Sequence, residues 1–329
     1  MGRRELVEIA IDALLVAGAA LAHFLDATPV LQFVLAACAI AGLARLVGSA
    51  TEQLGGRLGS AGAGAIQSAL GNLPELFIAL FALHDGLVTL VQAALIGSVL
   101  ANSVLVLGIA FTVGGLRHGT QAFDSPRARI IATLTVLAAA ILSVPSLAHA
   151  FHAPAAAHSR SLSFVCAGVL LAVFVLTLPG LLAPLPDEAE HEPPRWSLRT
   201  TAAVLALAAA AAALVSDWFV SALRPAIETL HMSQSFAGLV VVAIAGNAVE
   251  NVVGVQLAAR NRPDFAIAVI VSSSLQVALA LTPALVFLSL LFAAGLGALV
   301  VYDGESTWPE GVILIGLYVV IAASFWWGA

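Results

Sequence analysis

Long apolar segments separated by short polar ones occupy nearly the whole chain. A helix needs about 20 apolar residues to cross the hydrocarbon of a membrane. The pattern predicts membrane helices at residues 6–24, 29–50, 62–84, 87–115, 127–148, 162–184, 199–223, 234–259 and 263–290. A last span is expected at 311–327, after the polar loop at 302–310. We therefore expect an all-α polytopic membrane protein with 10 or 11 transmembrane helices.

The composition supports this architecture. The chain has 329 residues, of which 61% are hydrophobic and only 10% are charged. Soluble proteins contain about 25% charged residues. All 13 basic residues are arginine, so a catalytic lysine, a Schiff base and a P-loop are excluded. The apolar run at 9–22 resembles a signal peptide, but many spans follow it, so we interpret it as an uncleaved first helix.

The arginines predict the orientation, because loops rich in basic residues stay in the cytoplasm. With a cytoplasmic N-terminus, the other cytoplasmic loops are those at 45–57, 116–129, 185–199 and 260–262. Eleven of the 13 arginines then lie on that side, and only Arg160 and Arg224 lie outside. This distribution favours an N-terminus in the cytoplasm. We expect a multi-pass protein of a prokaryotic cytoplasmic membrane.

Two polar motifs inside apolar segments repeat each other. The motif Gly71-Asn72-Leu73-Pro74-Glu75 recurs 175 residues later as Gly246-Asn247-Ala248-Val249-Glu250. In each case a serine pattern follows after 26 residues, at Gly97-Ser98 and at Ser272-Ser273. A carboxylate within a membrane span is costly and marks a functional site by default. The two motif-bearing spans run in opposite directions in the arginine topology, which predicts inverted repeats around one midplane site.

The first motif has the chemistry of a broken helix that carries ligands. Asn72 and Glu75 are three residues apart and share one helix face, and Asn247 and Glu250 do the same. Pro74 cannot donate a backbone hydrogen bond, so it frees a carbonyl within the membrane. That carbonyl needs a partner, and a bound cation is one candidate.

The serine patterns supply more oxygen atoms. Ser98 and Asn102 lie four residues apart, and Ser273 and Gln276 lie three apart. A purely structural role is the alternative for these four residues. Together with the motifs they form an oxygen-rich set without His or Cys, which suits Ca²⁺ better than zinc or copper. When the ion leaves, two close carboxylates would repel each other and bind a proton, so the pair can hold Ca²⁺ or protons but not both.

Other classes of protein are less well supported. We expect no enzyme, because the spans carry no Ser-His or Asp-Asp arrangement and no zinc motif such as H-E-x-x-H. A passive channel is a further alternative, against which the inverted duplication with central carboxylates argues. We expect no cofactor and no nucleic-acid partner. The expected partners are the lipid bilayer and the transported ions, Ca²⁺ with H⁺ or Na⁺, and a homo-oligomer is left open.

At these motifs the chain resembles the calcium/cation antiporter superfamily, most closely its cation/proton exchanger branch. The matching segments are 71–75, 96–102, 246–250, 273–279 and the late segment 303–311. The resemblance implies two inverted five-helix repeats after an extra first helix. It divides the chain into the extra helix at 1–25, a first repeat at 26–184, an acidic cytoplasmic linker at 185–198 and a shortened second repeat at 199–329. The linker acids are Asp187, Glu188, Glu190 and Glu192.

The resemblance also implies a function. The chain would be a secondary active antiporter that exchanges Ca²⁺ for H⁺ by alternating access. The implied ion ligands are Glu75, Glu250, Asn72, Asn247, Ser98, Ser273, Asn102 and Gln276. The chain departs from the branch at Pro74, Asn251 and Ser272, which leaves Na⁺/Ca²⁺ exchange or monovalent cation/H⁺ exchange as alternatives.

Overall fold

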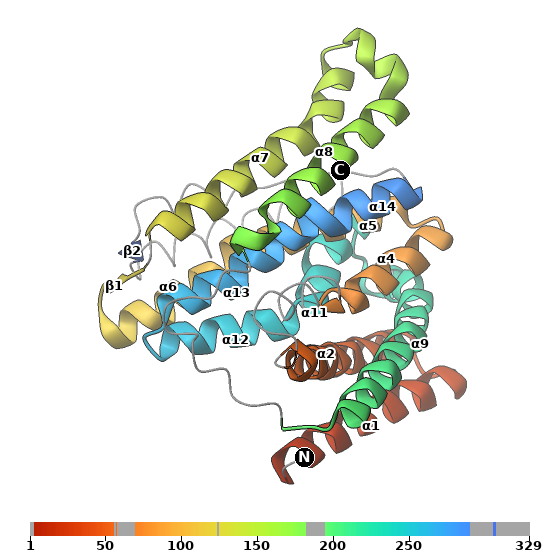
Figure 1. Ribbon diagram of the computed structural model, residues 1–329. Helices are drawn as coiled ribbons and strands as arrows, with labels where there is room; N and C mark the ends of the chain where they lie inside the picture. The colour runs from red at the N-terminus through yellow and green to blue at the C-terminus, as the bar shows by residue number, and fades with distance from the viewer. Residues whose placement is uncertain are drawn as a thin grey trace. The chain divides into compact units, whose positions relative to one another are not determined.

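The protein is almost entirely helical. The computed structural model describes residues 3–55, 57, 70–123, 125–181, 195–289 and 305–306 (Figure 1). Within these ranges seven helices are long and apolar enough to cross a membrane, or eight if the bent pair 234–246 and 250–258 forms one span. The protein is therefore a multi-pass membrane protein, as the hydrophobic pattern predicts. The span expected at 311–327 lies outside the described residues.

The chain divides into two compact units, and each takes helices from both expected repeats. The first unit comprises Met1–Gly86 and Val175–His231, and the second comprises Leu87–Phe174 and Met232–Ala329. The repeat boundaries at 184 and 199 remain a prediction.

The first unit is a set of packed helices. Its members are α1 (Arg3–Phe24), α2 (Pro29–Gly55), α4 (Leu73–His84) and α9 (Leu198–Leu230). The helix α2 packs along α9, where the rings of Phe33 and Phe219 stack with centroids 5.0 Å apart. The helix α4 also packs on α9, and α1 packs on α2. The apolar faces of these helices are thereby buried against one another.

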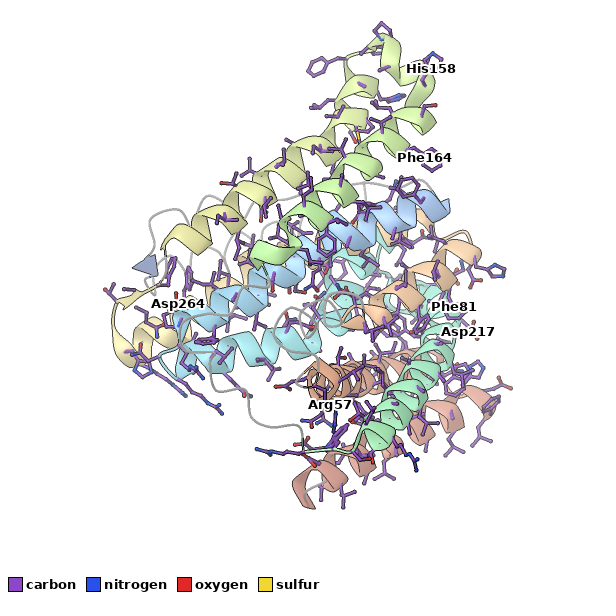
Figure 2. All side chains as sticks on the ribbon, viewed as in Figure 1. Arg57, Phe81, His158, Phe164, Asp217 and Asp264 are labelled. Carbon is purple, nitrogen blue, oxygen red and sulfur yellow. The ribbon has the colours of Figure 1, made fainter. Side chains whose placement is uncertain are left out.

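The start of α9 is tied to the end of α2. The Oε1 atom of Gln53 accepts hydrogen bonds from the backbone amides of Arg195, at 2.7 Å, and Trp196, at 3.2 Å. The guanidinium of Arg57 donates to the carbonyl of Trp196. Figure 2 shows Arg57 beside the first turns of α9. The hydroxyl of Ser197 then caps α9 by accepting from the amide of Thr200 at 3.1 Å.

The second unit holds three spans that change from α- to π-helix. The span from 88 to 118 consists of α5 (Val88–Leu100), η1 (Ala101–Val106) and α6 (Leu107–His118). The span from 234 consists of α10 (Gln234–Phe236), η3 (Ala237–Val242), α11 (Ala243–Gly246) and α12 (Ala248–Ala259). The span from 263 consists of α13 (Pro263–Gln276), η4 (Val277–Leu281) and α14 (Thr282–Ser289). Short π-helical turns are often found at functional sites.

The remaining elements of this unit are a hairpin and a short strand pair. The helices α7 (Ser125–Ala150) and α8 (Ser159–Leu181) are joined through a 3₁₀ turn, η2 (Pro154–His158), and the last turns of α8, from Val175, belong to the first unit. Figure 2 shows His158 at the tip of this hairpin. The strands β1 (Gln121–Ala122) and β2 (Glu305–Ser306) pair antiparallel. They are the exception to the all-α architecture within the described residues.

Two glycines bring α5 and η3 into close contact. A Cβ atom on Gly97 would lie 2.1 Å from the carbonyl oxygen of Leu239, and one on Gly238 would lie 2.4 Å from that of Leu90. Small residues at helix crossings allow backbones to approach closely in membranes. The crossing places the last turn of α5 beside the span that carries the second motif.

Candidate ion-exchange site

Both copies of the repeated motif adopt the same local structure. Asn72 has φ −94° and ψ 17°, and Asn247 has φ −99° and ψ 19°. A helix of 12 residues follows each of them, α4 at 73–84 and α12 at 248–259, so the 175-residue offset holds at both helix ends. The two carboxylates, Glu75 and Glu250, each lie in the first turn of these helices.

The second motif breaks its span. The segments 234–246 and 250–258 meet at an angle of 67°. Asn247 ends α11 at this break and begins a new helix, α12, whose first turn holds Glu250. Helix N-termini carry unsatisfied amide groups, so a break of this kind can place polar groups at the middle of a membrane.

A buried hydrogen-bond network joins four of the predicted ligands within the second unit. Asn247 donates from Nδ2 to Oγ of Ser98 at 2.7 Å and to the carbonyl of Ala243 at 3.1 Å. Its Oδ1 accepts from Oγ of Ser273 at 2.8 Å and from Nδ2 of Asn102 at 3.0 Å. Asn102 also donates to Oγ of Ser273 at 3.1 Å. Asn247 is thus the hub that connects α5, η1 and α13 to the helix break.

The amide oxygens of Asn102 and Asn247 differ in the number of hydrogen bonds that they accept. Asn102 is fully buried, and its Oδ1 has no hydrogen-bond partner among the described residues. Buried polar atoms normally have a partner, and an orphaned one needs an explanation. Oδ1 of Asn247 already accepts two hydrogen bonds, whereas Oδ1 of Asn102 retains its full capacity to bind a cation.

A pair of serines next to these residues was not predicted. Oγ of Ser103 and Oγ of Ser274 lie 2.9 Å apart, and both side chains are buried. Ser274 also lies 3.5 Å from the carbonyl of Val99, which is its own counterpart at the 175-residue offset. A residue that contacts its own counterpart lies on the axis that relates two repeats. The repeat offset does not reveal the pair, because Ser103 and Ser274 correspond to Ala278 and Val99.

Two of the three π-helices, η1 and η4, obey the same repeat, and the residues that correspond to η3, 62–67, lie outside the described residues. Adding 175 to the bounds of η1 gives 276–281, and η4 occupies Val277–Leu281. Each begins one turn after a predicted serine ligand, Ser98 or Ser273. The α13 helix packs on η1, and α5 packs on η4. The two irregular turns therefore flank the hydrogen-bond network from both sides.

The other predicted ligands lie in different places. Glu250 is partly exposed and lies one turn after Asn247, and Gln276 is the last residue of α13. Asn72 and Glu75 belong to the first unit, at the start of α4. Among the described residues, no group of three or more His, Cys, Asp or Glu side chains could hold a metal ion. An ion in this part of the chain would therefore rely on amide, hydroxyl and backbone oxygens beside a glutamate.

Comparisons of sequence place the chain among exchangers. The model of the family described as sodium/calcium exchanger protein matches residues 28–182 and 200–327. A Ca²⁺/H⁺ antiporter of Synechocystis sp. is 32% identical over 345 residues, which cover 92% of this chain and 93% of the relative. The Ca²⁺/H⁺ antiporter ChaA of Bacillus subtilis is 32% identical, with 87% and 89% covered.

Comparisons of structure agree with this placement. The structure of native YfkE matches with a TM-score of 0.80 at 28% identity, over 97% of this chain and 99% of that one. The H⁺/Ca²⁺ exchanger CAX matches with a TM-score of 0.73 over 97% of this chain and 88% of that one, at 14% identity, a level that shows the fold alone. These likenesses confirm the predicted fold class, an all-helical membrane protein with the exchanger architecture.

Proposed function

The chain belongs to the sodium/calcium exchanger protein family, and on this premise we propose that it is a secondary active antiporter that exchanges Ca²⁺ for H⁺. It uses no bound cofactor and performs no enzymatic reaction. The similarity to Ca²⁺/H⁺ antiporters over about nine-tenths of the chain supports the choice of ions. The observation that carries the proposal is the buried network of Ser98, Asn102, Asn247 and Ser273 at the helix break before Glu250.

The chemistry of these residues suits a hard divalent cation. Ca²⁺ takes six to eight oxygen ligands, and amide, hydroxyl and carboxylate oxygens are its usual partners in proteins. The carboxylates of Glu75 and Glu250 neutralise its charge, and Oδ1 of Asn102 is ready to bind it without the loss of a hydrogen bond. The hydroxyls and the amide of Asn247 hold the remaining ligands in place.

Exchange follows from competition for the carboxylates. A Ca²⁺ ion compensates two negative charges, and in its absence a low dielectric disfavours two ionised carboxylates. Protons therefore bind to the carboxylates when Ca²⁺ leaves, and a site that holds no ion and two ionised carboxylates is avoided. The membrane is the cytoplasmic one and the N-terminus is cytoplasmic, which the distribution of eleven of the 13 arginines supports.

Ion flux in proteoliposomes tests the proposal. An imposed pH gradient should drive accumulation of Ca²⁺, and an equal Na⁺ gradient without a pH gradient should not. Glu250→Gln should abolish the flux, since the neutral amide cannot exchange a proton for the ion. Glu228→Gln is the matched control, because Glu228 is an exposed carboxylate near the end of α9 and should leave the flux intact. Accumulation driven by Na⁺ alone would overturn the choice of H⁺.

A further inference from the structure

Three charged side chains meet between the first two membrane helices and contribute no ligand to the proposed exchange site. Arg45 of α2 binds Oε2 of Glu8 through Nη1 at 2.5 Å and Oδ2 of Asp12 through Nη2 at 2.7 Å. Both carboxylates belong to α1, within the membrane span Glu5–Phe24. Ionisable residues within a span are costly, so such a group is expected to have a function.

The contact is built into the seam between the two helices. Residues 8, 12, 15, 19 and 22 of α1 alternate spacings of four and three, the pattern of one helix face. Asp12, Ala19 and Ala22 on this face are buried. A Cβ atom on Gly42 of α2 would lie 2.5 Å from Oδ1 of Asp12. The glycine therefore provides the space in which the carboxylate of Asp12 lies.

The three residues differ in exposure. The side chain of Asp12 is 5% exposed, whereas those of Arg45 and Glu8 are 33% and 46% exposed. Asp12 is thus the desolvated member, and the partly solvated pair of Arg45 and Glu8 lies one turn nearer the start of α1. A buried ion pair adds little net stability, but it specifies one relative position of the groups that form it.

Packing within the first unit connects this position to Glu75. The α2 helix that carries Arg45 packs along α9, and α9 packs on α4, whose first turn holds Glu75. All four helices belong to the same compact unit. A shift of α1 against α2 would therefore act on the helix that positions one of the two proposed ion-binding carboxylates.

We propose that Glu8, Asp12 and Arg45 form a charge latch that holds α1 on α2 and thereby sets the rate of the transport cycle. The inference rests on the proposed exchange function and deepens it. The members of the latch are positioning residues and bind no ion. The helix α1 then affects the transport rate through its contact with α2. Loss of the latch slows the movement of α2 and α9 and leaves the affinity for Ca²⁺ unchanged.

Transport kinetics of latch variants in proteoliposomes test this role. Asp12→Asn leaves the neutral pair of Arg45 and Glu8, so the variant should fold. Its maximal transport rate should fall about fivefold, while the half-saturating concentration of Ca²⁺ should stay within about twofold of the wild-type value. Arg45→Gln leaves two carboxylates without a cation and should be more severe. The double variant should be less severe than Arg45→Gln, because it removes one uncompensated charge. Asp26→Asn, in the exposed turn after α1, is the matched control.

Two kinetic results would overturn the latch. One is a wild-type maximal rate in folded Asp12→Asn protein, and the other is a changed half-saturation with an unchanged maximal rate, which would make the group part of the ion path. Hydrogen exchange of residues 5–24 in the purified full chain provides a readout that does not depend on Ca²⁺ transport. Asp12→Asn should raise exchange there and Asp26→Asn should not. If wild-type protein fails to exchange Ca²⁺ for H⁺, the proposed function fails, while unchanged hydrogen exchange in Asp12→Asn would refute the latch.

Discussion

The Nδ2 atom of Asn247 donates a hydrogen bond to Oγ of Ser98 at 2.7 Å and so joins two residues that are 149 positions apart. The same nitrogen donates to the carbonyl of Ala243, four residues earlier, at 3.1 Å. This side-chain amide therefore adds a second hydrogen bond to a carbonyl that also accepts from the backbone N–H of Asn247, and it ties the break to α5. The contact explains how an irregular backbone is tolerated in the middle of an apolar span.

Asn247→Ala should be among the most damaging single changes in the second unit. It removes four buried hydrogen bonds, those to Ser98, Asn102, Ser273 and the carbonyl of Ala243, at about 0.5–1.5 kcal/mol for each. We expect a loss of about 3 kcal/mol or more in the free energy of unfolding and loss of Ca²⁺ flux. Thermal unfolding in detergent and proteoliposome flux measure the two effects.

Asn251→Ala is the control for the stability effect of Asn247→Ala. Its buried Oδ1 has no hydrogen-bond partner among the described residues, so truncation should cost little stability. Equal melting temperatures for the two variants would contradict the hub role of Asn247.

Neighbouring serines on α13 should respond differently to the same substitution. Ser273 is buried and bonded to both Asn247 and Asn102. Within the described part of the chain, Ser272 donates only to the carbonyl of Val269 in its own helix, at 3.3 Å. Ser273→Ala should lower stability by about 1–2 kcal/mol and reduce flux, because it removes an acceptor and a donor from the network. Ser272→Ala should leave both within error. A larger loss for Ser272→Ala in calorimetry or flux would show that the wrong serine has been placed in the site.

Much of the helical framework was predictable because membrane spans are encoded by length and apolarity. The segments expected at 29–50 and 87–115 correspond to α2 at Pro29–Gly55 and to α5 through α6 at Val88–His118. The helix expected at 199–223 extends to Leu230, because Pro225 is accommodated within it. The π-helices were not predicted, because hydrophobic periodicity reports which face is buried and not which carbonyl each amide selects.

The candidate site was partly predictable because its motifs are repeated in the sequence. The duplication identified Ser98, Asn247 and Ser273, and the spacing of four residues from Ser98 identified Asn102. The structure joins all four. The same rule for charges within a span applies to Asp12, but the first helix precedes both expected repeats, so no second copy marks this carboxylate. The register of α1 on α2 depends on Gly42 and Arg45 together, which only the packed helices reveal.

Gly97→Ala should force α5 and η3 apart. The new methyl group would lie 2.1 Å from the carbonyl oxygen of Leu239, and a backbone atom cannot move aside as a side chain can. Overpacking of this kind costs about 1–3 kcal/mol or more, and we expect a matching fall in melting temperature and in flux. Gly168→Ala in α8 is the matched control, since no described atom lies within 4 Å of the position that its new methyl group would take. An equal effect of both changes would mean that the α5–η3 crossing is not close-packed.

Asn102→Asp should make stability depend more strongly on Ca²⁺. A carboxylate oxygen would replace Nδ2, which now lies 3.0 Å from Oδ1 of Asn247, so two acceptors would face each other and the ion-free protein should melt at a lower temperature. Ca²⁺ would gain a charged ligand and stabilise the folded state by mass action, so the rise in melting temperature on adding Ca²⁺ should exceed that of the wild type.

Ser103→Ala separates this charge effect from general loosening of the same helical turn. It removes the 2.9 Å contact with Ser274, so it should lower the melting temperature by an amount that Ca²⁺ does not alter. Differential scanning fluorimetry across a Ca²⁺ titration compares the two variants directly. If Asn102→Asp also responded to Ca²⁺ as the wild type does, the oxygen of residue 102 would not face the ion. Asn102 would then be a purely structural residue, like Ser103.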